Sequence, residues 1–310
     1  MISKSRLSKI GIGTWGVGGF AKRNIENNDE KQIDAIAYML KHGMNYVELN
    51  IWSAEGHSVG LVSKAIKKSN IGRDNLFLSQ AIYSYTAPSL ILAKKELDTC
   101  LKTFKTDYMD SLSLNEAAIA TIGYEQVIDW LKQLFKDKII RYVNLNNPSF
   151  ERIIEMKKVF GDKIFSIEIG FNFEIRENVK NGIIDFADKN NILCVIYQPL
   201  RRNRTALRNW PILVELSNKY HKTQNQIILN WICSKGFLPL TKSETVAHIK
   251  EHLNSVQFAM DQTDLKRLDE FQPPNYTPPH PYWGIAGEGI RVDQLSNVFD
   301  EDFDKQTRSK

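Results

Sequence analysis

The chain has 310 residues, enough for one large domain or two small ones, and its formal charge of +5 is too mild and too evenly scattered to indicate nucleic-acid binding. Neither the N-terminus nor any apolar run is typical of a signal peptide or a membrane span, so we expect no membrane partner. Three cysteines that share no metal-ligand spacing, Cys100, Cys194 and Cys233, predict free thiols in a reducing cytoplasm and no metal site.

Eight short apolar segments are the predicted strands, and longer amphipathic segments separate them. The first strand lies near Gly11, and the others end at Asn50, Gln80, Leu114, Leu145, Phe171, Leu200 and Thr241. They are apolar throughout rather than alternating, which is typical of a parallel sheet that is covered on its outer face. The clearest helical patterns span residues 30–43, 89–104 and 124–135, the first with Asn28 or Asp29 as its N-cap and Gly43 at its end.

Eight strand–helix units over roughly 250 residues, without a break in composition, predict a single closed (β/α)8 TIM barrel. A doubly wound sheet is the alternative. We place the barrel in residues 1–271, because residues 272–310 are first rich in proline and aromatic residues and then acidic. Such a tail either packs on the barrel or is partly disordered. A packed tail would cover the barrel mouth or contact another subunit, so the predicted macromolecular partner is a protein or a second copy of the chain.

Polar side chains follow the predicted strands, where (β/α)8 barrels carry their active sites. Glu48, Asn115 and Glu168 are among them, and we expect a small molecule to bind in this mouth. No His or Tyr suited to proton transfer is expected there. His57 is interpreted as a helix cap or a loop contact rather than as a catalytic group.

Six segments, taken together, resemble the aldo-keto reductase superfamily. They are GIGTWGVGG at residues 11–19, residues 42–66, LKTFKTDYMDSLSLN at 101–115, IIRYVNLNNPS at 139–149, VIYQPL at 195–200 and LPLTKSETVAHIKEHL at 238–253. The resemblance runs in order from Leu7 to Phe271. It implies the same barrel and identifies the chain as a divergent member.

The resemblance also implies that the catalytic tetrad of the superfamily is absent. Its Asp, Tyr, Lys and His fall on Glu48, Ser53, Ala81 and Asn115. A serine hydroxyl is a far weaker acid than a phenol, and alanine offers no group at all. Only Glu48 and Asn115 therefore remain as candidate catalytic residues. Four simultaneous changes imply that the usual reduction of carbonyl compounds has been lost.

The cofactor positions implied by the resemblance are better preserved. They are Thr14, Asn147, Glu168, Tyr197, Lys242, Ser243 and His248. Lys242 and Ser243 resemble the pair that binds the 2′-phosphate of NADP, and Glu168 replaces a glutamine that contacts the nicotinamide carboxamide. The arginines after Leu200 would either bind phosphate or fill the groove. NADP(H) binding and a relic Lys-Ser pair are both open interpretations.

Three functions are compatible with this pattern. The first is a non-reducing binding or regulatory protein that still binds NADP(H). The second is an enzyme with rebuilt carboxylate chemistry, a lyase, isomerase or dehydratase in a biosynthetic pathway, in which Glu48, Glu116 and Glu168 converge. The third is an atypical NADP(H)-dependent oxidoreductase. Carboxyl groups around an open pocket favour the second, whereas a filled pocket favours the first. We expect Glu48 to accept a hydrogen bond from Asn115 or Arg201, to stay hydrated, or to have a raised pKa.

Overall fold

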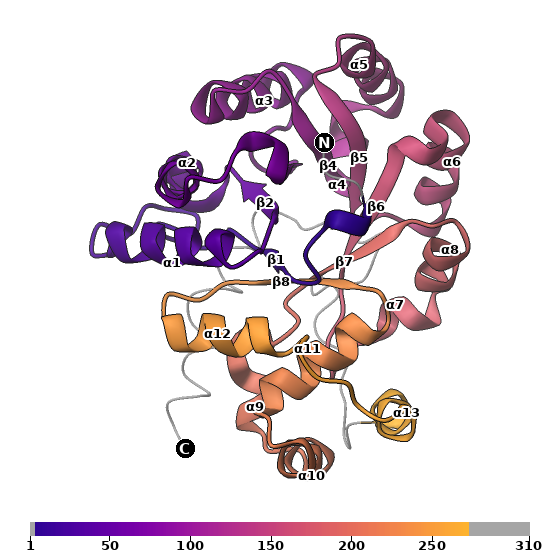
Figure 1. The fold of residues 1–310 in the computed structure, drawn as a ribbon. Helices are drawn as coiled ribbons and strands as arrows, with labels where there is room; N and C mark the ends of the chain where they lie inside the picture. Colours follow the sequence, from indigo (N-terminus) through magenta and orange to yellow (C-terminus); the bar gives the residue numbers. More distant parts are fainter. Residues whose placement is uncertain (1–3, 273–310) are drawn as a thin grey trace.

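Eight parallel strands form a closed barrel, in which β1 pairs with both β2 and β8 (Figure 1). The computed structural model describes residues 4–272. The strands are β1 Gly11–Ile12, β2 Tyr46–Asn50, β3 Phe77–Ile82, β4 Met109–Asn115, β5 Ile140–Asn146, β6 Ile164–Gly170, β7 Leu193–Tyr197 and β8 Leu238–Thr241. Their order around the barrel is their order along the chain. The predicted (β/α)8 fold is therefore confirmed, and the doubly wound alternative is wrong.

The helices surround the barrel, as Figure 1 shows in a view nearly along its axis. They are α1 Asp29–Lys41, α2 His57–Ser69, α3 Leu90–Phe104, α4 Glu116–Ile122, α5 Tyr124–Lys136, α6 Phe150–Phe160, α7 Glu177–Lys180, α8 Ile183–Lys189, α9 Arg204–Leu207, α10 Pro211–Tyr220, α11 Gln224–Ser234, α12 Val246–Asn254 and α13 Gln262–Glu270. Side-chain oxygens of Asn28, Ser89 and Ser149 cap α1, α3 and α6. Of the two predicted caps of α1, Asn28 is therefore the one that the structure shows. No helix within residues 4–272 is long and apolar enough to cross a membrane.

Strand β7 is shorter than its apolar segment predicts. It ends at Tyr197 rather than at Leu200, because Gln198 adopts a left-handed conformation with φ of 53° and Pro199 has no N–H to donate to the sheet. Strand β3 instead extends two residues beyond the predicted end and reaches Ile82. These shifts matter because they change which residues stand at the mouth of the barrel.

Aromatic rings close the amino-terminal end of the barrel interior. Tyr46 stacks on Phe77 with ring centroids 5.1 Å apart, Phe77 on Phe165 at 4.9 Å, and Phe165 lies 4.7 Å from Tyr142. Leu7 packs against this group, which we call the aromatic floor. Offset ring contacts at these separations add stabilisation beyond the burial of apolar area. The barrel is therefore solid at this end.

The barrel interior becomes polar one layer above the aromatic floor. Side chains of a regular strand alternate between its two faces, so the residues two positions after Phe77 and Tyr142 also point inward. Ser79 follows Phe77 in this way, and Asn144 follows Tyr142. Ser111 donates to Ser79 at 2.8 Å, and Asn144 donates to Ser113 at 2.9 Å. This hydrogen-bonded layer supports the candidate site above it.

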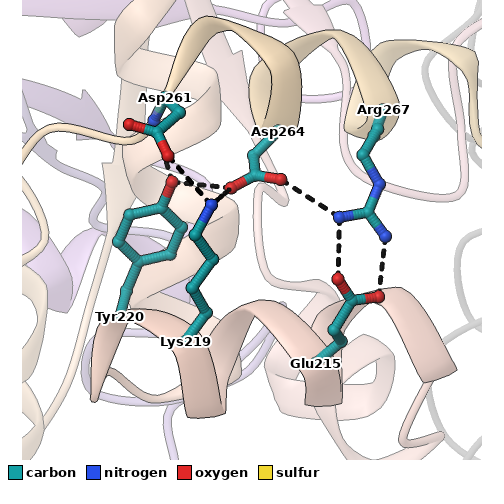
Figure 2. Close-up of polar contacts among 6 residues, drawn as sticks. All are labelled: Glu215, Lys219, Tyr220, Asp261, Asp264 and Arg267. Carbon is teal, nitrogen blue, oxygen red and sulfur yellow. Dashed lines mark hydrogen bonds and ion pairs between the residues drawn. The ribbon is translucent and has the colours of Figure 1, made fainter.

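Helices α10 and α13 are held together by a network of charged side chains, shown in Figure 2. The Asp264 carboxylate, with a side chain only 4% exposed, accepts hydrogen bonds from Lys219 at 2.6 Å, Tyr220 at 2.7 Å and Arg267 at 3.1 Å. Arg267 also donates two hydrogen bonds to Glu215, at 2.8 and 2.6 Å. The network fixes the last helix of the described chain. The predicted tail lies outside the described residues except for Gln272.

Candidate functional site

A cavity of about 510 Å3 lies at the carboxyl ends of the strands. One end is acidic and aromatic, lined by Glu48, Glu168, Tyr83, Tyr197 and Asn146. The other end is polar and carries charges of both signs, because Lys242 and Arg202 line it together with Glu251, Ser243 and His248. The predicted small-molecule mouth is thus an open cavity rather than a filled one, and its two ends differ in charge.

Glu48 projects into the cavity from β2 and is 3% exposed. Its Oε2 accepts a hydrogen bond from the Thr14 backbone N–H at 3.1 Å. Burial raises the pKa of Glu48 to about 7, and the Thr14 contact offsets part of that rise. The two predicted donors are wrong, because Asn115 donates to Asn146 at 2.9 Å and Arg201 pairs with Glu174. The alternative expectation of a raised pKa agrees with the structure.

Glu168 projects into the same cavity from β6 and is 2% exposed. Burial and the neighbouring Glu48 raise the pKa of Glu168 to about 8, against hydrogen bonds that lower it. Asn144 donates one of these at 3.0 Å, and Ser113 donates another at 3.5 Å. Within residues 4–272, the two carboxylates are stabilised by hydrogen-bond donors, and no cation contributes. The glutamates therefore titrate as a pair, and each disfavours the charge of the other.

Glu116 does not join this pair, so the predicted convergence of three carboxyl groups is wrong. It begins α4 and forms an ion pair with Arg152 at 3.1 Å. Glu116 follows β4 directly, but its side chain points outward to Arg152 on α6. The cavity therefore contains two of the three expected glutamates.

The remaining positions that the resemblance assigns to the tetrad have structural contacts. Ser53 is fully buried, and its Oγ accepts a hydrogen bond from the Gly16 N–H at 3.0 Å. Asn115 caps α4 by accepting from the Ala117 N–H at 3.1 Å, while its amide nitrogen holds Asn146. Ala81 is buried within β3. Asn115 thus reaches the cavity only through Asn146, and Ser53 lies outside its lining.

Tyr83 lines the cavity and was not among the predicted site residues. Its ring stacks on Tyr85 at 5.0 Å, Tyr85 contacts Trp52 at 5.5 Å, and Trp52 contacts Trp15 at 5.1 Å. Burial, Tyr85 and the two glutamates raise the pKa of Tyr83 well above its usual range, so the phenol remains a hydrogen-bond donor at neutral pH. The signal was present in the aromatic segment YSY, but the predicted strand ended too early to place it at the mouth.

The cofactor positions implied by the resemblance are mostly brought together. Six of them line the cavity: Asn147, Glu168, Tyr197, Lys242, Ser243 and His248. Tyr197 donates to Asn147 at 3.0 Å, and the Asn147 N–H donates to the Glu168 carbonyl at 2.9 Å. Thr14 is outside the lining and acts on the site by holding Glu48. Desolvation within the cavity and the nearby Arg202 lower the pKa of Lys242, although the neighbouring Glu244 raises it.

The loop after β7 carries the arginines and has an unusual backbone. Arg201, Arg202 and Asn203 have φ values of 48°, 54° and 69°, in the left-handed region where residues other than glycine are strained. Arg201 is neutralised by Glu174, whereas the Arg202 guanidinium lies 4.8 Å from the centre of the Phe20 ring. The two arginines border the cavity without closing it.

His57 has a structural contact, as the sequence indicates. Its Nε2 lies 2.6 Å from Asp29 Oδ2, which joins the start of α2 to the start of α1. The described part of the chain contains no group of three or more His, Cys, Asp or Glu residues arranged to hold a metal ion.

The fold is a (β/α)8 barrel with a cavity at the carboxyl ends of its strands. The sequence model of the aldo/keto reductase family matches residues 9–273, and the chain belongs to that family.

Curated relatives include reductases from two yeasts. An NADPH-dependent alpha-keto amide reductase of Saccharomyces cerevisiae is 27% identical over 219 residues, which cover 67% of this chain and 70% of that protein. An NAD/NADP-dependent indole-3-acetaldehyde reductase of Schizosaccharomyces pombe is 25% identical over 274 residues, which cover 84% of this chain and 91% of that protein.

Solved structures show the same fold. A thermostable aldo-keto reductase in complex with the inhibitor epalrestat has a TM-score of 0.77 at 25% identity, covering 85% of this chain and 94% of that one. An aldo/keto reductase from Klebsiella pneumoniae in complex with NADP and acetate has a TM-score of 0.72 at 18% identity, covering 88% and 93%.

Proposed function

We propose that this protein binds NADP(H) in the cavity and does not carry out the usual carbonyl reduction of its family. The observation that carries the proposal is the cavity itself, which brings Lys242 and Ser243 at one end together with Asn147 and Tyr197 toward the other. The Klebsiella structure, of the same fold, was determined with NADP bound. Reduction is not expected, because no phenol, lysine or histidine stands at the corresponding tetrad positions.

The residues present fit a nucleotide. Thr241 Oγ1 and His252 Nδ1 are buried, belong to cavity-lining residues and have no hydrogen-bond partner within residues 4–272. Buried polar atoms without a partner are costly, so a polar ligand at this end would be stabilising. Lys242 would supply a point charge to a phosphate, and Tyr197 would offer an aromatic face to a planar ring. When bound, NADP(H) supplies hydride chemistry.

Binding is tested by titrating the full chain with NADPH and NADH and following tryptophan fluorescence and the melting temperature. We expect NADPH to bind more tightly, because a 2′-phosphate adds negative charge near Lys242. Lys242→Ala should weaken NADPH far more than NADH, whereas Lys250→Ala, an exposed lysine on α12 outside the cavity lining, should change neither. Equal affinities for the two nucleotides, or no binding of either, would contradict the proposal.

A second function is favoured by the two buried carboxyl groups in an open cavity. With raised pKa values, one glutamate can hold a proton near neutral pH while the other accepts one, which suits a lyase, isomerase or dehydratase. Proton exchange tests this directly: hydroxy-carbonyl compounds incubated with the protein in D2O should gain deuterium, and Glu168→Gln should abolish the exchange. Consumption of NADP(H) in the same mixtures would instead indicate an atypical oxidoreductase.

A further inference from the structure

Charge is separated along the cavity. Two cations and one carboxylate, Lys242, Arg202 and Glu251, line one end, whereas of the charged groups in the described chain only the carboxyl groups of Glu48 and Glu168 line the other. Arg201 adds little positive charge, because Glu174 neutralises it. A ligand that complements this arrangement carries anionic groups at one end and a cationic group at the other. Charge complementarity of this kind decides which of two otherwise similar ligands binds.

The two redox forms of a nicotinamide nucleotide differ in this respect. Both carry phosphates, but the oxidised ring is a pyridinium cation and the reduced ring is neutral. Contacts with the phosphates and the adenosine are common to both forms and cannot distinguish them. Only groups near the ring contribute to a difference in affinity, because a ligand form is favoured solely by its differential contacts.

We propose that the acidic end formed by Glu48 and Glu168 makes this protein bind NADP+ more tightly than NADPH, so that it responds to the oxidation state of the nucleotide pool. The inference rests on the proposed function, because it assumes that the nucleotide occupies the cavity. Within residues 4–272 the carboxyl pair has hydrogen-bond donors but no cation of its own. A pyridinium ring at this end would supply the missing positive charge.

Glu48 and Glu168 are the groups at this end of the cavity whose charge changes near neutral pH, because their neighbours do not titrate there. Tyr46 lies beneath it on β2, Tyr83 and Tyr85 follow β3, and Tyr197 ends β7. Burial and the negative charge of the glutamates raise the pKa of each phenol, so all four stay neutral. The hydrogen-bond donors Thr14, Ser113, Asn144 and Asn146 do not titrate.

The preference for NADP+ therefore increases with pH. Protonated carboxyl groups give little discrimination, whereas ionised ones attract the pyridinium. Because burial and mutual repulsion hold the pKa values of the pair near 7 and 8, the change falls between pH 6 and pH 8.5. A cation that stabilises the ionised form also lowers the pKa of the pair, so NADP+ binding releases protons and NADPH binding does not. Opposite charges a few ångströms apart in a partly buried site change affinity by roughly 10- to 100-fold.

The experiment is isothermal titration calorimetry of the full chain with NADP+ and with NADPH, at pH 6 and pH 8.5. Each titration is repeated in two buffers of different ionisation enthalpy, which reports the number of protons released. We expect the ratio of the two dissociation constants to shift toward NADP+ by about tenfold or more between the two pH values. Proton release should accompany NADP+ alone.

Glu48→Gln and Glu168→Gln should each reduce the pH dependence of that ratio. Glu96→Gln is the matched control, because Glu96 is also buried with a pKa raised to about 7 but lies on α3, outside the cavity lining. Equal affinities of both forms at both pH values would overturn the inference and leave the proposed function intact. Tighter binding of NADPH would also overturn it, and no binding of either form would overturn both.

Discussion

The two interior glutamates, Glu48 and Glu168, are buried in the barrel, and burial disfavours their charged forms. Their pKa values are raised in the folded chain relative to the ordinary value of 4.5, to about 7 for Glu48 and about 8 for Glu168. The folded state therefore binds more protons than the unfolded state between those values. Stability from these groups is fully present below about pH 4.5 and is lost as the pH rises through 7 to 8.

Replacing Glu48 by glutamine should remove this pH-dependent cost. At pH 8 we expect Glu48→Gln to stabilise the fold by on the order of 2 kcal/mol, because a poorly compensated buried charge is gone while the amide oxygen can still accept from Thr14. At pH 5 the change should be small, because the native carboxyl group is already protonated. Urea unfolding at the two pH values measures this.

The control for that prediction is Glu26→Gln, a change at an exposed position outside the helices and strands. It should leave stability within about 0.5 kcal/mol at both pH values. If Glu48→Gln instead destabilised the chain at pH 8, the carboxylate itself would be required by the fold.

The candidate site could be predicted in part from individual residues. Lys242, Ser243 and Tyr197 could be placed by resemblance, because their short motifs keep the spacing of the family. The partner of Glu48 could not, because it is a backbone N–H of Thr14, and a main-chain donor leaves no mark in a side-chain pattern. Glu116 was misplaced for a related reason: its arginine comes from α6, which is distant in the sequence.

At the scale of helices, the network between α10 and α13 concentrates three donors on a single carboxylate (Figure 2). Asp264→Asn should destabilise the chain by about 1–2 kcal/mol, because an amide accepts fewer hydrogen bonds and its charged partners are partly screened by solvent. The pKa of Asp264 is lowered: burial raises it, but hydrogen bonds from Lys219, Tyr220 and Arg267 outweigh that effect. Its contribution is therefore present above about pH 4 and lost as the pH falls further.

Urea denaturation at pH 7 and pH 3 compares Asp264→Asn with the original chain. The matched control is Glu270→Gln, which removes an exposed carboxylate 3.6 Å from Lys266 on the same helix. That change should cost no more than about 0.5 kcal/mol. A similar loss in both variants would indicate that helix charge, rather than the network, stabilises α13.

The positions at which the β-strands end were harder to predict from the sequence than the existence of the strands. An apolar run such as ILCVIYQPL contains no local signal that Gln198 adopts a left-handed conformation, with φ of 53°. The existence of the strands was predictable, because a strand covered on its outer face must be apolar over its length. Their limits depend on tertiary contacts.

For the whole molecule, eight apolar segments and a family-wide order of motifs were sufficient to predict the barrel. The reaction could not be predicted in the same way, because the resemblance places it at only four positions, Glu48, Ser53, Ala81 and Asn115, and the proposal of a lost reduction rests on them. We expect the purified protein to show no measurable NADPH-dependent reduction of an aromatic aldehyde, since loss of a positioned general acid alone removes about 10²–10⁴-fold in rate.

The measurement is NADPH absorbance in the presence of a benzaldehyde series, with nucleotide binding verified on the same preparation. Turnover at ordinary reductase rates would show that another group, such as Tyr83, donates the proton. Absence of turnover together with absence of binding would instead count against the cofactor assignment.

The aromatic floor has a kinetic consequence. Within the described chain, stacked rings seal the amino-terminal end of the barrel, so molecules enter and leave the cavity through the carboxyl end. Anything that reaches Glu48 and Glu168 would leave through the opening by which it entered. With its ring at the acidic end, the proposed nucleotide would block this passage for as long as it stays bound. Its rate of departure would then also limit how fast the two glutamates exchange protons and solutes with the surrounding water.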